Sequence, residues 1–377
     1  MTARVVNIPR QSLYLLVTWV VLLVFGTIMV GSASVAMPGD YIIKQLVNLC
    51  ISLFLAAVVL TIPLTTWARF YWLGWVVSLF LVVLVLVPGV GYEVKGATRW
   101  VRIGGFSLQA VEVAKFGLMI FLAGYLTHYH DMLQQSPNRI LVPLAMVFIV
   151  CALVVAEPDL GSAAVVLAAT LSVLFMAGAK LRFVLLMVVG GALLFALMVW
   201  LEPFRMRRMA AFTDPWAVPF DTGYQLVQAL IAFGRGELLG LGLGEGIQKL
   251  SYLPEAHNDF IFAVIAEELG SIGAIALIVL YTFFVSMVLS VAKRSLQTGN
   301  LFAGYCCYFV GFTFAYQFLV NVGVNVGVLP TKGLTLPFIS YGGNSLMVSC
   351  ALFAFVLRCS WAEERAPATS RKSSVGR

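Results

Sequence analysis

Residues 259–291 read DFIFAVIAEELGSIGAIALIVLYTFFVSMVLSV, and this stretch defines the kind of environment in which the chain folds. The 24 residues from 269 to 292 contain no charged side chain. A helix of this length spans about 36 Å, which is enough to cross a hydrocarbon core of about 30 Å. The stretch therefore predicts a membrane-spanning helix.

The rest of the chain has the same character. Of its 377 residues, 61% are hydrophobic and 11% are charged, and the mean hydropathy is +0.97. Soluble domains are about half apolar and a quarter charged, so the excess apolar residues must face lipid. The composition excludes a soluble globule and predicts an all-α polytopic membrane protein, with residues 1–377 forming a single transmembrane domain.

Ten apolar runs are long enough to be spans. They are residues 13–35, 45–62, 70–88, 111–126, 140–156, 160–178, 183–201, 259–291, 301–328 and 343–358. An even number of spans places both termini on one side, which then carries 13 of the 24 Lys and Arg residues. This positive bias predicts cytoplasmic termini, with residues 1–12 as the N-terminus and residues 359–377 as a disordered tail.

Three segments on the opposite side are too unusual to be simple connectors: residues 89–110, 202–258 and 327–342. In the large periplasmic loop 202–258, between the seventh and eighth spans, Leu226, Leu230 and Phe233 recur at helical spacing and predict an amphipathic helix on the outer leaflet. The four glycines from Gly240 to Gly246 lack the preceding strand of a nucleotide-binding loop, so they predict a flexible bend.

The distribution of charge, cysteine and histidine along the chain argues against a nucleic-acid-binding, disulfide-stabilised or metal-binding protein. The net charge of +7 is spread over short loops, which indicates an anionic lipid surface and not nucleic acid. The six cysteines lie in or at the ends of apolar runs, without zinc or disulfide spacing. His128 and His130 have no third ligand at a suitable spacing, so no metal site is predicted.

Charged residues at membrane depth are costly unless they are paired or face a cavity. Glu112 and Lys115 lie one turn apart and could pair on one helix face. Asp159 begins the sixth span. Two interpretations remain open here: Asp159 caps its helix while Lys115 extends to the interface, or Lys115 and Asp159 form an ion pair that walls a polar cavity.

The start of the eighth span, residues 253–260, reads LPEAHNDF and places Asp259 at the mouth of the helix. On an ideal helix Glu267 and Glu268 do not share a face with Asp259. Asp259 is then either a helix N-cap or a general base that faces an outer cavity.

Several basic residues lie on the outer side, contrary to the positive-inside rule that was used above to orient the chain. They are Lys95, Arg99, Arg102, Arg205, Arg207 and Arg208. Lipid headgroups or a partner protein would explain them in general terms. A diphosphate would explain them more specifically, because a guanidinium group forms two parallel hydrogen bonds to phosphate oxygens and stabilises a departing anion.

These outer segments resemble those of the SEDS family (shape, elongation, division and sporulation). The matching motifs are KGATRW at 95–100, PDLG at 158–161, GYQ at 223–225, LPEAHNDFIF at 253–262 and LPTKGLTLPFISYGG at 329–343. The last motif is closest to the division branch of the family. The chain departs from the family pattern at Ala110 and Val111 (usually Pro and Ser), at Glu157 (usually Gln) and at Asn344 (usually Ser).

The resemblance implies a peptidoglycan glycosyltransferase of the bacterial inner membrane that polymerises lipid II at the division septum, with its active site facing the periplasm. It implies Asp259 as the catalytic base. The implied substrate-binding residues are Lys95, Arg99, Lys115, Asp159, Arg205, Arg208, His257, Lys332 and Ser340. No cofactor is required, and assistance of the diphosphate by Mg²⁺ or Mn²⁺ is left open.

The implied partners are a class B penicillin-binding protein (an FtsI-type transpeptidase), other membrane proteins of the divisome, and membrane lipid. Two alternative functions remain. One is a lipid II flippase, which needs charged residues along a transmembrane path. The other is an elongation-type polymerase, similar to RodA. A division scaffold would be a third possibility, in which septal assembly survives the loss of Asp259.

Overall fold

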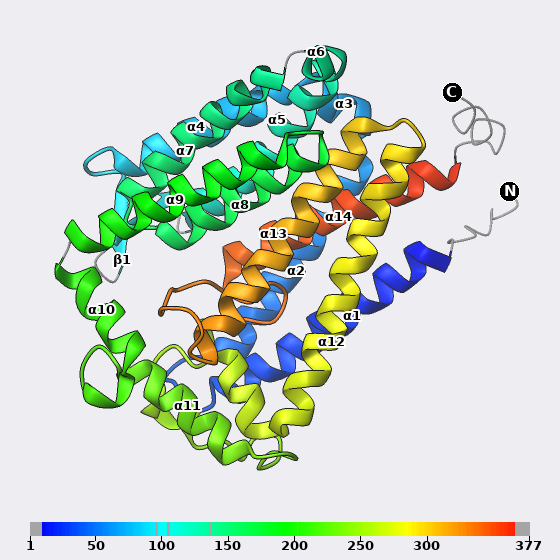
Figure 1. The fold of residues 1–377 in the computed structure, drawn as a ribbon. Helices are drawn as coiled ribbons and strands as arrows, with labels where there is room; N and C mark the ends of the chain where they lie inside the picture. Colours follow the sequence, from blue (N-terminus) through cyan, green and yellow to red (C-terminus); the bar gives the residue numbers. More distant parts are fainter. Residues whose placement is uncertain (1–9, 95–96, 104–105, 136, 202, 366–377) are drawn as a thin grey trace, which may run out of the picture.

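The computed structural model describes residues 10–94, 97–103, 106–135, 137–201 and 203–365, and these residues form a helical bundle with one small sheet (Figure 1). The helices are α1 (Arg10–Ala33), α2 (Tyr41–Thr61), α3 (Leu64–Arg69), α4 (Tyr71–Leu86), α5 (Ala110–His128), α6 (His130–Gln135), α7 (Leu141–Ala156), α8 (Leu160–Met176), α9 (Leu181–Leu201), α10 (Pro203–Thr213), α11 (Tyr224–Gly236), α12 (Ile261–Gln297), α13 (Leu301–Asn325) and α14 (Gly343–Arg365). Short turns η1 (Pro137–Ile140), η2 (Pro215–Ala217) and η3 (Gln248–Tyr252) and strands β1 (Gly91–Val94), β2 (Ala97–Ile103) and β3 (Phe106–Gln109) complete the described elements.

Each of the ten predicted apolar runs coincides with a helix. Seven of these helices are long and apolar enough to cross a membrane, namely α1, α2, α5, α9, α12, α13 and α14. The other three, α4, α7 and α8, are apolar helices of 16 or 17 residues. Helix α14 continues to Arg365, so the disorder predicted from residue 359 is wrong as far as Arg365, and residues 366–377 lie outside the described part of the chain.

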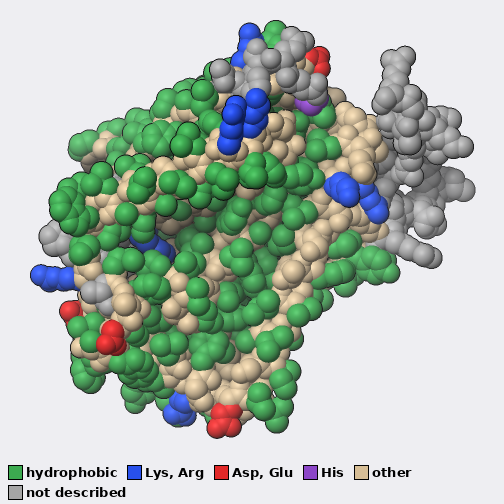
Figure 2. Space-filling view, viewed as in Figure 1, with side chains coloured by type: hydrophobic (Ala, Val, Ile, Leu, Met, Phe, Trp, Pro, Cys, Tyr) green, Lys and Arg blue, Asp and Glu red, His purple; other side chains and the backbone are tan. Residues whose placement is uncertain are grey.

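The face of the bundle seen in Figure 2 is mostly hydrophobic, with charged side chains mainly near its margins. Helix α9 is the clearest case, since Leu186 and Leu193 are 63% and 67% exposed. Apolar side chains exposed at this density are stable only against lipid. The structure is therefore that of an integral membrane protein.

The bundle has two distinct ends. At one end the hydroxyls of Ser12 in α1 and Ser360 in α14 lie 2.7 Å apart, and Arg294 near the end of α12 donates to Gln11. The beginning of α1 and the end of α14 therefore share this end, here called the terminal end. The sheet, α10 and α11 lie at the opposite end, here called the sheet end (Figure 1).

The sheet corrects the prediction of an all-helical chain. Strands β1, β2 and β3 pair antiparallel in sequence order, and Trp100 of β2 lies opposite Gln109 of β3. Aromatic and β-branched residues such as Tyr92, Trp100 and Val101 favour this extended pairing. The sheet follows α4 and leads directly into α5, so it places β2 beside the ends of the neighbouring helices.

Helix α11 occurs where an amphipathic helix was predicted, but its apolar face packs on protein. Leu226 and Ala229 are buried, and the ring centroids of Phe233 and of Phe262 in α12 lie 5.9 Å apart. Gly236 approaches the backbone of Ala266 so closely that no side chain would fit there. The apolar stripe of α11 therefore attaches the large loop to α12, and the prediction that it lies on the outer leaflet is wrong for this face.

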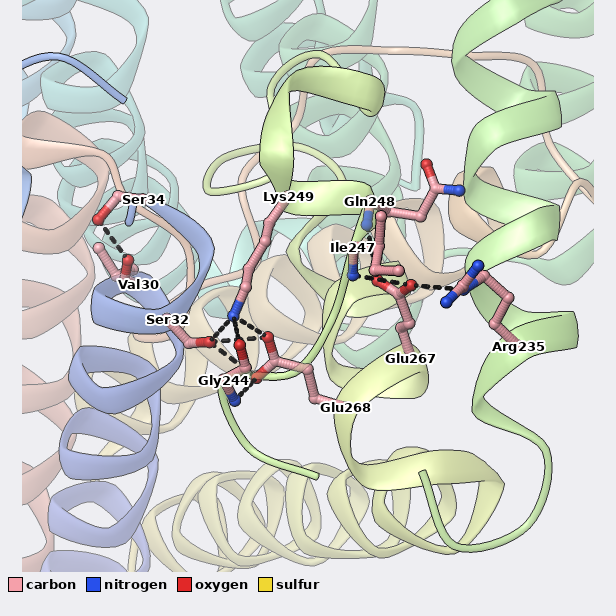
Figure 3. A network of polar contacts seen from close by, with 10 residues as sticks. All are labelled: Val30, Ser32, Ser34, Arg235, Gly244, Ile247, Gln248, Lys249, Glu267 and Glu268. Atoms are coloured by element: carbon pink, nitrogen blue, oxygen red, sulfur yellow. Dashed lines mark hydrogen bonds and ion pairs between the residues drawn. The ribbon is translucent and has the colours of Figure 1, made fainter. Parts of the chain in front are cut away.

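Behind α11, the glycine-rich segment is held by a buried polar network (Figure 3). Glu268 of α12 accepts hydrogen bonds from Lys249 Nζ (2.6 Å), Gly244 N (3.0 Å) and Ser32 Oγ (2.7 Å). Glu268 is fully buried and Lys249 is 2% exposed. The network therefore joins α1, α12 and the segment between α11 and η3.

The adjacent Glu267 completes this network. Its carboxylate accepts the backbone N–H groups of Ile247 and Gln248, each at 3.1 Å, and pairs with Arg235 at 3.2 Å. Gly240, with φ of +80°, lies against the carbonyl of Glu268, where a Cβ would come within 2.2 Å of the oxygen. The predicted bend is present, with positive φ at Gly240, Gly242 and Gly244, and two buried carboxylates bind the loop that forms it.

Removal of one partner from this network should destabilise the fold. Lys249→Met leaves Glu268 buried without its cation, which costs about 3–5 kcal/mol of unfolding free energy. Thermal unfolding of the purified protein measures the loss. Lys180→Met, at an exposed position, is the matched control with an expected change within about 0.5 kcal/mol. Equal melting temperatures for both variants would contradict the assigned role of the network.

Candidate functional site

A pocket of about 340 Å³ opens near the sheet end of the bundle. Its lining comes from β2, β3, α11, the segment before α12, the segment between α13 and α14, and the start of α14. The lining includes both charge signs, with Arg99, Lys332, Glu255 and Asp259. Pockets of this volume with convergent polar groups are typical of binding and catalytic sites.

Asp259 lies just outside helix α12. The helix begins at Ile261, and its N-cap is Phe260, which makes no side-chain capping hydrogen bond. The N-cap interpretation of Asp259 is therefore wrong. Its carboxylate instead lies against Gly333, where an added Cβ would come within 2.9 Å of Oδ2. Asp259 and the loop that carries Lys332 thus meet in the pocket wall.

The backbone of Asp259 is held from α13. Asn321 and Asn325 each donate a side-chain hydrogen bond of 2.9 Å to the carbonyl oxygen of Asp259. Both amides are buried, with exposures of 1% and 0%. The motifs in the sequence do not point to these residues, although two amides four residues apart in an apolar helix are a signal that could have been noticed.

Ser340 and His257 were both predicted to bind substrate, and neither is part of the pocket lining. The Ser340 hydroxyl donates to the carbonyl of Asn258 at 2.7 Å and accepts from Leu336 N at 2.8 Å. His257 is buried against the rings of Tyr41 and Tyr341, with centroid distances of 5.0 and 5.4 Å. Through its bond to Asn258, which does line the pocket, Ser340 holds part of the pocket wall.

Arg99 links the pocket to the turn between α7 and α8. Its guanidinium donates to the carbonyl of Pro158 at 2.6 Å and lies 3.9 Å from Asp159. Asp159 also caps α8 by accepting from Ser162 N at 3.2 Å. The predicted capping role of Asp159 is confirmed, and its ionic partner is Arg99. Arg99 is thereby held at the edge of the pocket with its side chain 27% exposed.

The predicted ion pair between Lys115 and Asp159 is wrong. Lys115 Nζ binds Glu112, one turn earlier on α5, at 2.8 Å, and both side chains are buried. A partner on the same helix face satisfies the charge without help from another element. Neither Lys115 nor Glu112 lines the pocket.

Three predicted basic residues are not described at the level of their side chains. Lys95 lies outside the described residues, in the gap between β1 and β2. Arg205 and Arg208 lie on helix α10, near the sheet end, but their side chains are outside the described part of the structure.

The pocket also contains residues that were not predicted from the sequence. Trp100 and Gln225 both line it, and both fall within the quoted motifs KGATRW and GYQ. Gln109 lines it opposite Trp100 in the sheet. Asn344, a departure from the family pattern, donates to the carbonyl of Ser107 at 2.7 Å and so ties α14 to the sheet.

Among the described residues, no group of three or more His, Cys, Asp or Glu side chains is placed to hold a metal ion by itself. His128 packs against the rings of Tyr71 and Tyr129, with centroid distances of 6.1 and 4.7 Å. Within the pocket, Asp259 and Glu255 are the two carboxylates of the lining. A cation bound there would need further oxygen ligands from a substrate or from water.

Glu157, in the turn beside Arg99, is 1% exposed, and both carboxylate oxygens are buried without a hydrogen bond. Burial, and to a smaller extent the charge of Asp159, raise the pKa of Glu157 to about 8 against the opposing effect of Arg99. At neutral pH this carboxyl group is therefore mostly protonated. In that form it resembles the neutral amide of the glutamine that the family usually has here.

Comparison with known proteins gives consistent matches over almost the whole chain. The family model for the FtsW, RodA and SpoVE proteins, described as "Cell cycle protein", matches residues 12–365. A protein of Nitrosococcus halophilus named "Probable peptidoglycan glycosyltransferase FtsW" is 44% identical over 97% of this chain and 96% of its own length. A protein of the same name from Coxiella burnetii is 42% identical over 91% and 94%.

Solved structures agree with these relatives. A chain from a structure described as "Structural coordination of polymerization and crosslinking by a peptidoglycan synthase complex" matches with a TM-score of 0.76 and 28% identity, covering 93% of this chain and 98% of that one. The rod shape determining protein RodA of Thermus thermophilus matches with a TM-score of 0.69 and 28% identity, covering 93% and 96%.

The raised pKa of Glu157 predicts a pH-dependent stability. Between the unfolded pKa of about 4.5 and the folded value of about 8, the folded state binds more protons, so stability falls as pH rises through this range. Glu157→Gln removes the titrating group and should raise the melting temperature more at pH 8 than at pH 5. If the gain were the same at both pH values, Glu157 would have an ordinary pKa.

Proposed function

The chain belongs to the FtsW/RodA/SpoVE family of cell cycle proteins, and from this membership we propose that the pocket around Asp259 is the active site of a peptidoglycan glycosyltransferase. Relatives that are more than 40% identical over at least nine-tenths of the chain bear that name and the division-type designation FtsW. The chain is accordingly a glycosyltransferase of septal cell-wall synthesis.

The reaction polymerises lipid II into β-1,4-linked glycan. The Asp259 carboxylate accepts the proton of the 4-hydroxyl of the acceptor sugar as that oxygen forms a bond to C1 of the donor sugar. The bond between C1 and the diphosphate oxygen breaks, the α-linked donor is inverted, and undecaprenyl diphosphate leaves with the bonding electrons. A base positioned in this way contributes about 10² to 10⁴ in rate.

The leaving group needs positive charge more than it needs a proton. A diphosphate is already a stable anion, so cations can replace the general acid that a glycosidase supplies from a second carboxylate. Arg99 and Lys332 line the same pocket as Asp259 and are the proposed diphosphate ligands. Lys95, together with Arg205 and Arg208 of helix α10, is proposed to guide the lipid-linked diphosphate toward them.

One observation carries this proposal. Asp259, Arg99 and Lys332 come from three segments that are about 70 or more residues apart in the sequence, yet they line one pocket. One anionic base and two cations match the needs of the reaction described above. A flippase would need charges along a path through the membrane, whereas these three residues gather at one end of the bundle.

The proposed setting follows from the arrangement of the helices. All ten apolar helices cross the bacterial inner membrane at the division septum, the terminal end is cytoplasmic, and the sheet end with its pocket faces the periplasm. The proposed partner is a class B penicillin-binding protein of the FtsI type. In support, one of the matched structures belongs to a peptidoglycan synthase complex that coordinates polymerisation with crosslinking.

A divalent cation would act on the diphosphate. Mg²⁺ or Mn²⁺ would take Asp259 or Glu255 as protein ligands and would neutralise charge on the leaving group.

Replacement of the proposed base tests the reaction. Asp259→Asn should lower the rate of glycan formation from labelled lipid II by about 10² to 10⁴, in the presence of the transpeptidase partner, while lipid II binding is retained. Asp221→Asn, an exposed aspartate in the loop before α11, is the matched control and should keep the wild-type rate. Normal polymerisation by Asp259→Asn would refute the base, and lipid II transfer across vesicles without glycan would favour the flippase.

A methyl group at Gly333 tests the position of the carboxylate. In Gly333→Ala the new Cβ would meet Asp259 Oδ2 at 2.9 Å, and the side chain of Asp259 must shift. Displacement by about 1 Å can cost up to about 10² in rate, whereas the melting temperature should change little. Gly190→Ala on α9, where a Cβ meets nothing within 4 Å, is the control. An unchanged rate in Gly333→Ala would mean that the carboxylate is not held there.

A further inference from the structure

The beginning of helix α12 departs from regular helical hydrogen bonding at Asp259. In a continuous α-helix the N–H of Ala263 would donate to the carbonyl of Asp259. Here the Ala263 N–H is shared between Oδ1 of Asn325 and the carbonyl of Phe260, each at 3.0 Å, and Nδ2 of Asn325 donates to the Asp259 carbonyl at 2.9 Å. One side-chain amide from α13 is thus inserted into the link between these two residues.

The orientation of the inserted amide is determined by its partners. The backbone N–H of Ala263 can only donate, so it must face the oxygen of Asn325. The amide nitrogen of Asn325 then faces the Asp259 carbonyl. It donates its second hydrogen to the carbonyl of Asn321, with a nitrogen–oxygen distance of 2.8 Å. Because Asn325 is fully buried, each of these bonds is protected from competition with water.

Asn321 adds a second link, to the loop that carries Lys332. Its Nδ2 donates to the Asp259 carbonyl at 2.9 Å and to the carbonyl of Leu334 at 2.7 Å. A single amide group therefore bridges the backbone of the proposed base and the backbone two residues after the proposed diphosphate ligand Lys332. The two segments cannot separate without breaking one of these buried bonds.

We propose that Asn321 and Asn325 are positioning residues that hold Asp259 outside helix α12 and keep its carboxylate at a constant distance from the Lys332 loop. This proposal rests on the assignment of Asp259 as the base. Asn325 stops the first helical turn from closing over Asp259, so the side chain faces Gly333 and the pocket. Asn321 makes the base and the cation-bearing loop move together.

The alternative is that both amides merely stabilise the bundle. In that case their loss would lower the melting temperature and the amount of folded enzyme, but each folded molecule would keep its kcat and its KM for lipid II. A positioning role instead lowers kcat in folded enzyme, because an interaction that aligns the reacting groups is lost.

Asn325→Asp provides the decisive variant. The substitution keeps the size of the side chain and the oxygen that accepts from Ala263, but it places an acceptor against the Asp259 carbonyl in place of a donor. We expect kcat for lipid II polymerisation, measured on the complex with the transpeptidase partner, to fall at least tenfold while the KM for lipid II stays within twofold.

Asn300→Asp is the matched control. Asn300 caps the other end of α13 by accepting from Ala303 N, and aspartate caps equally well, so kcat and KM should stay at the wild-type values. Asn321→Ser should lower kcat at least tenfold and also raise the KM, since it releases both the Asp259 backbone and the Lys332 loop. If Asn325→Asp does not fold, Asn321→Ser decides the proposal by the same measurements.

The outcomes separate this proposal from the proposed function. Folded Asn325→Asp with wild-type kcat, or with an increased KM and unchanged kcat, overturns the positioning role, provided that Asp259→Asn is inactive. If Asp259→Asn itself polymerises normally, the assignment of the base is wrong, and the positioning role is overturned with it.

Discussion

A charge that is buried among membrane-spanning helices needs a partner inside the protein, because the surrounding lipid offers no water to solvate it. The buried cations Lys115 and Lys249 each meet this constraint with a neighbouring carboxylate, Glu112 in one case and Glu268 in the other. The pair of Lys249 with Glu268 joins η3 to α12, whereas the pair of Lys115 with Glu112 lies within α5. Asp259 is different, because it lines an open pocket with Arg99 and Lys332 and is placed to act on a substrate.

Helix α12 connects these two uses of charge. Its first segment, residues 261–269, runs from Asp259 to the kink at Gly270, where φ is +69°. Asn325 defines the start of this segment, while Glu267 and Glu268 near its end bind the glycine-rich loop and α1. A displacement of that outer loop would therefore be transmitted along about two and a half helical turns to the proposed base.

The sequence predicts the apolar helices well, because length and hydropathy depend on single segments. It predicts Asp259 through the resemblance of its motif. It also anticipates the pair of Lys115 with Glu112, because these residues lie one turn apart on one helix. It does not predict that Asp159 pairs with Arg99 from a sheet that hydropathy cannot reveal, nor that carboxylates later in the chain bind the glycine-rich loop. Each of these contacts depends on packing between segments that are distant in sequence or on short strands without an apolar run.

The central claim is that one pocket brings together the base and the ligands of the leaving diphosphate. A cryo-electron microscopy structure of the inactive Asp259→Asn chain with its transpeptidase partner and lipid II tests it most directly. The account predicts the donor diphosphate against Arg99 and Lys332, and an acceptor 4-hydroxyl within about 3 Å of residue 259. A diphosphate bound elsewhere, with residue 259 out of reach of any sugar hydroxyl, would contradict it.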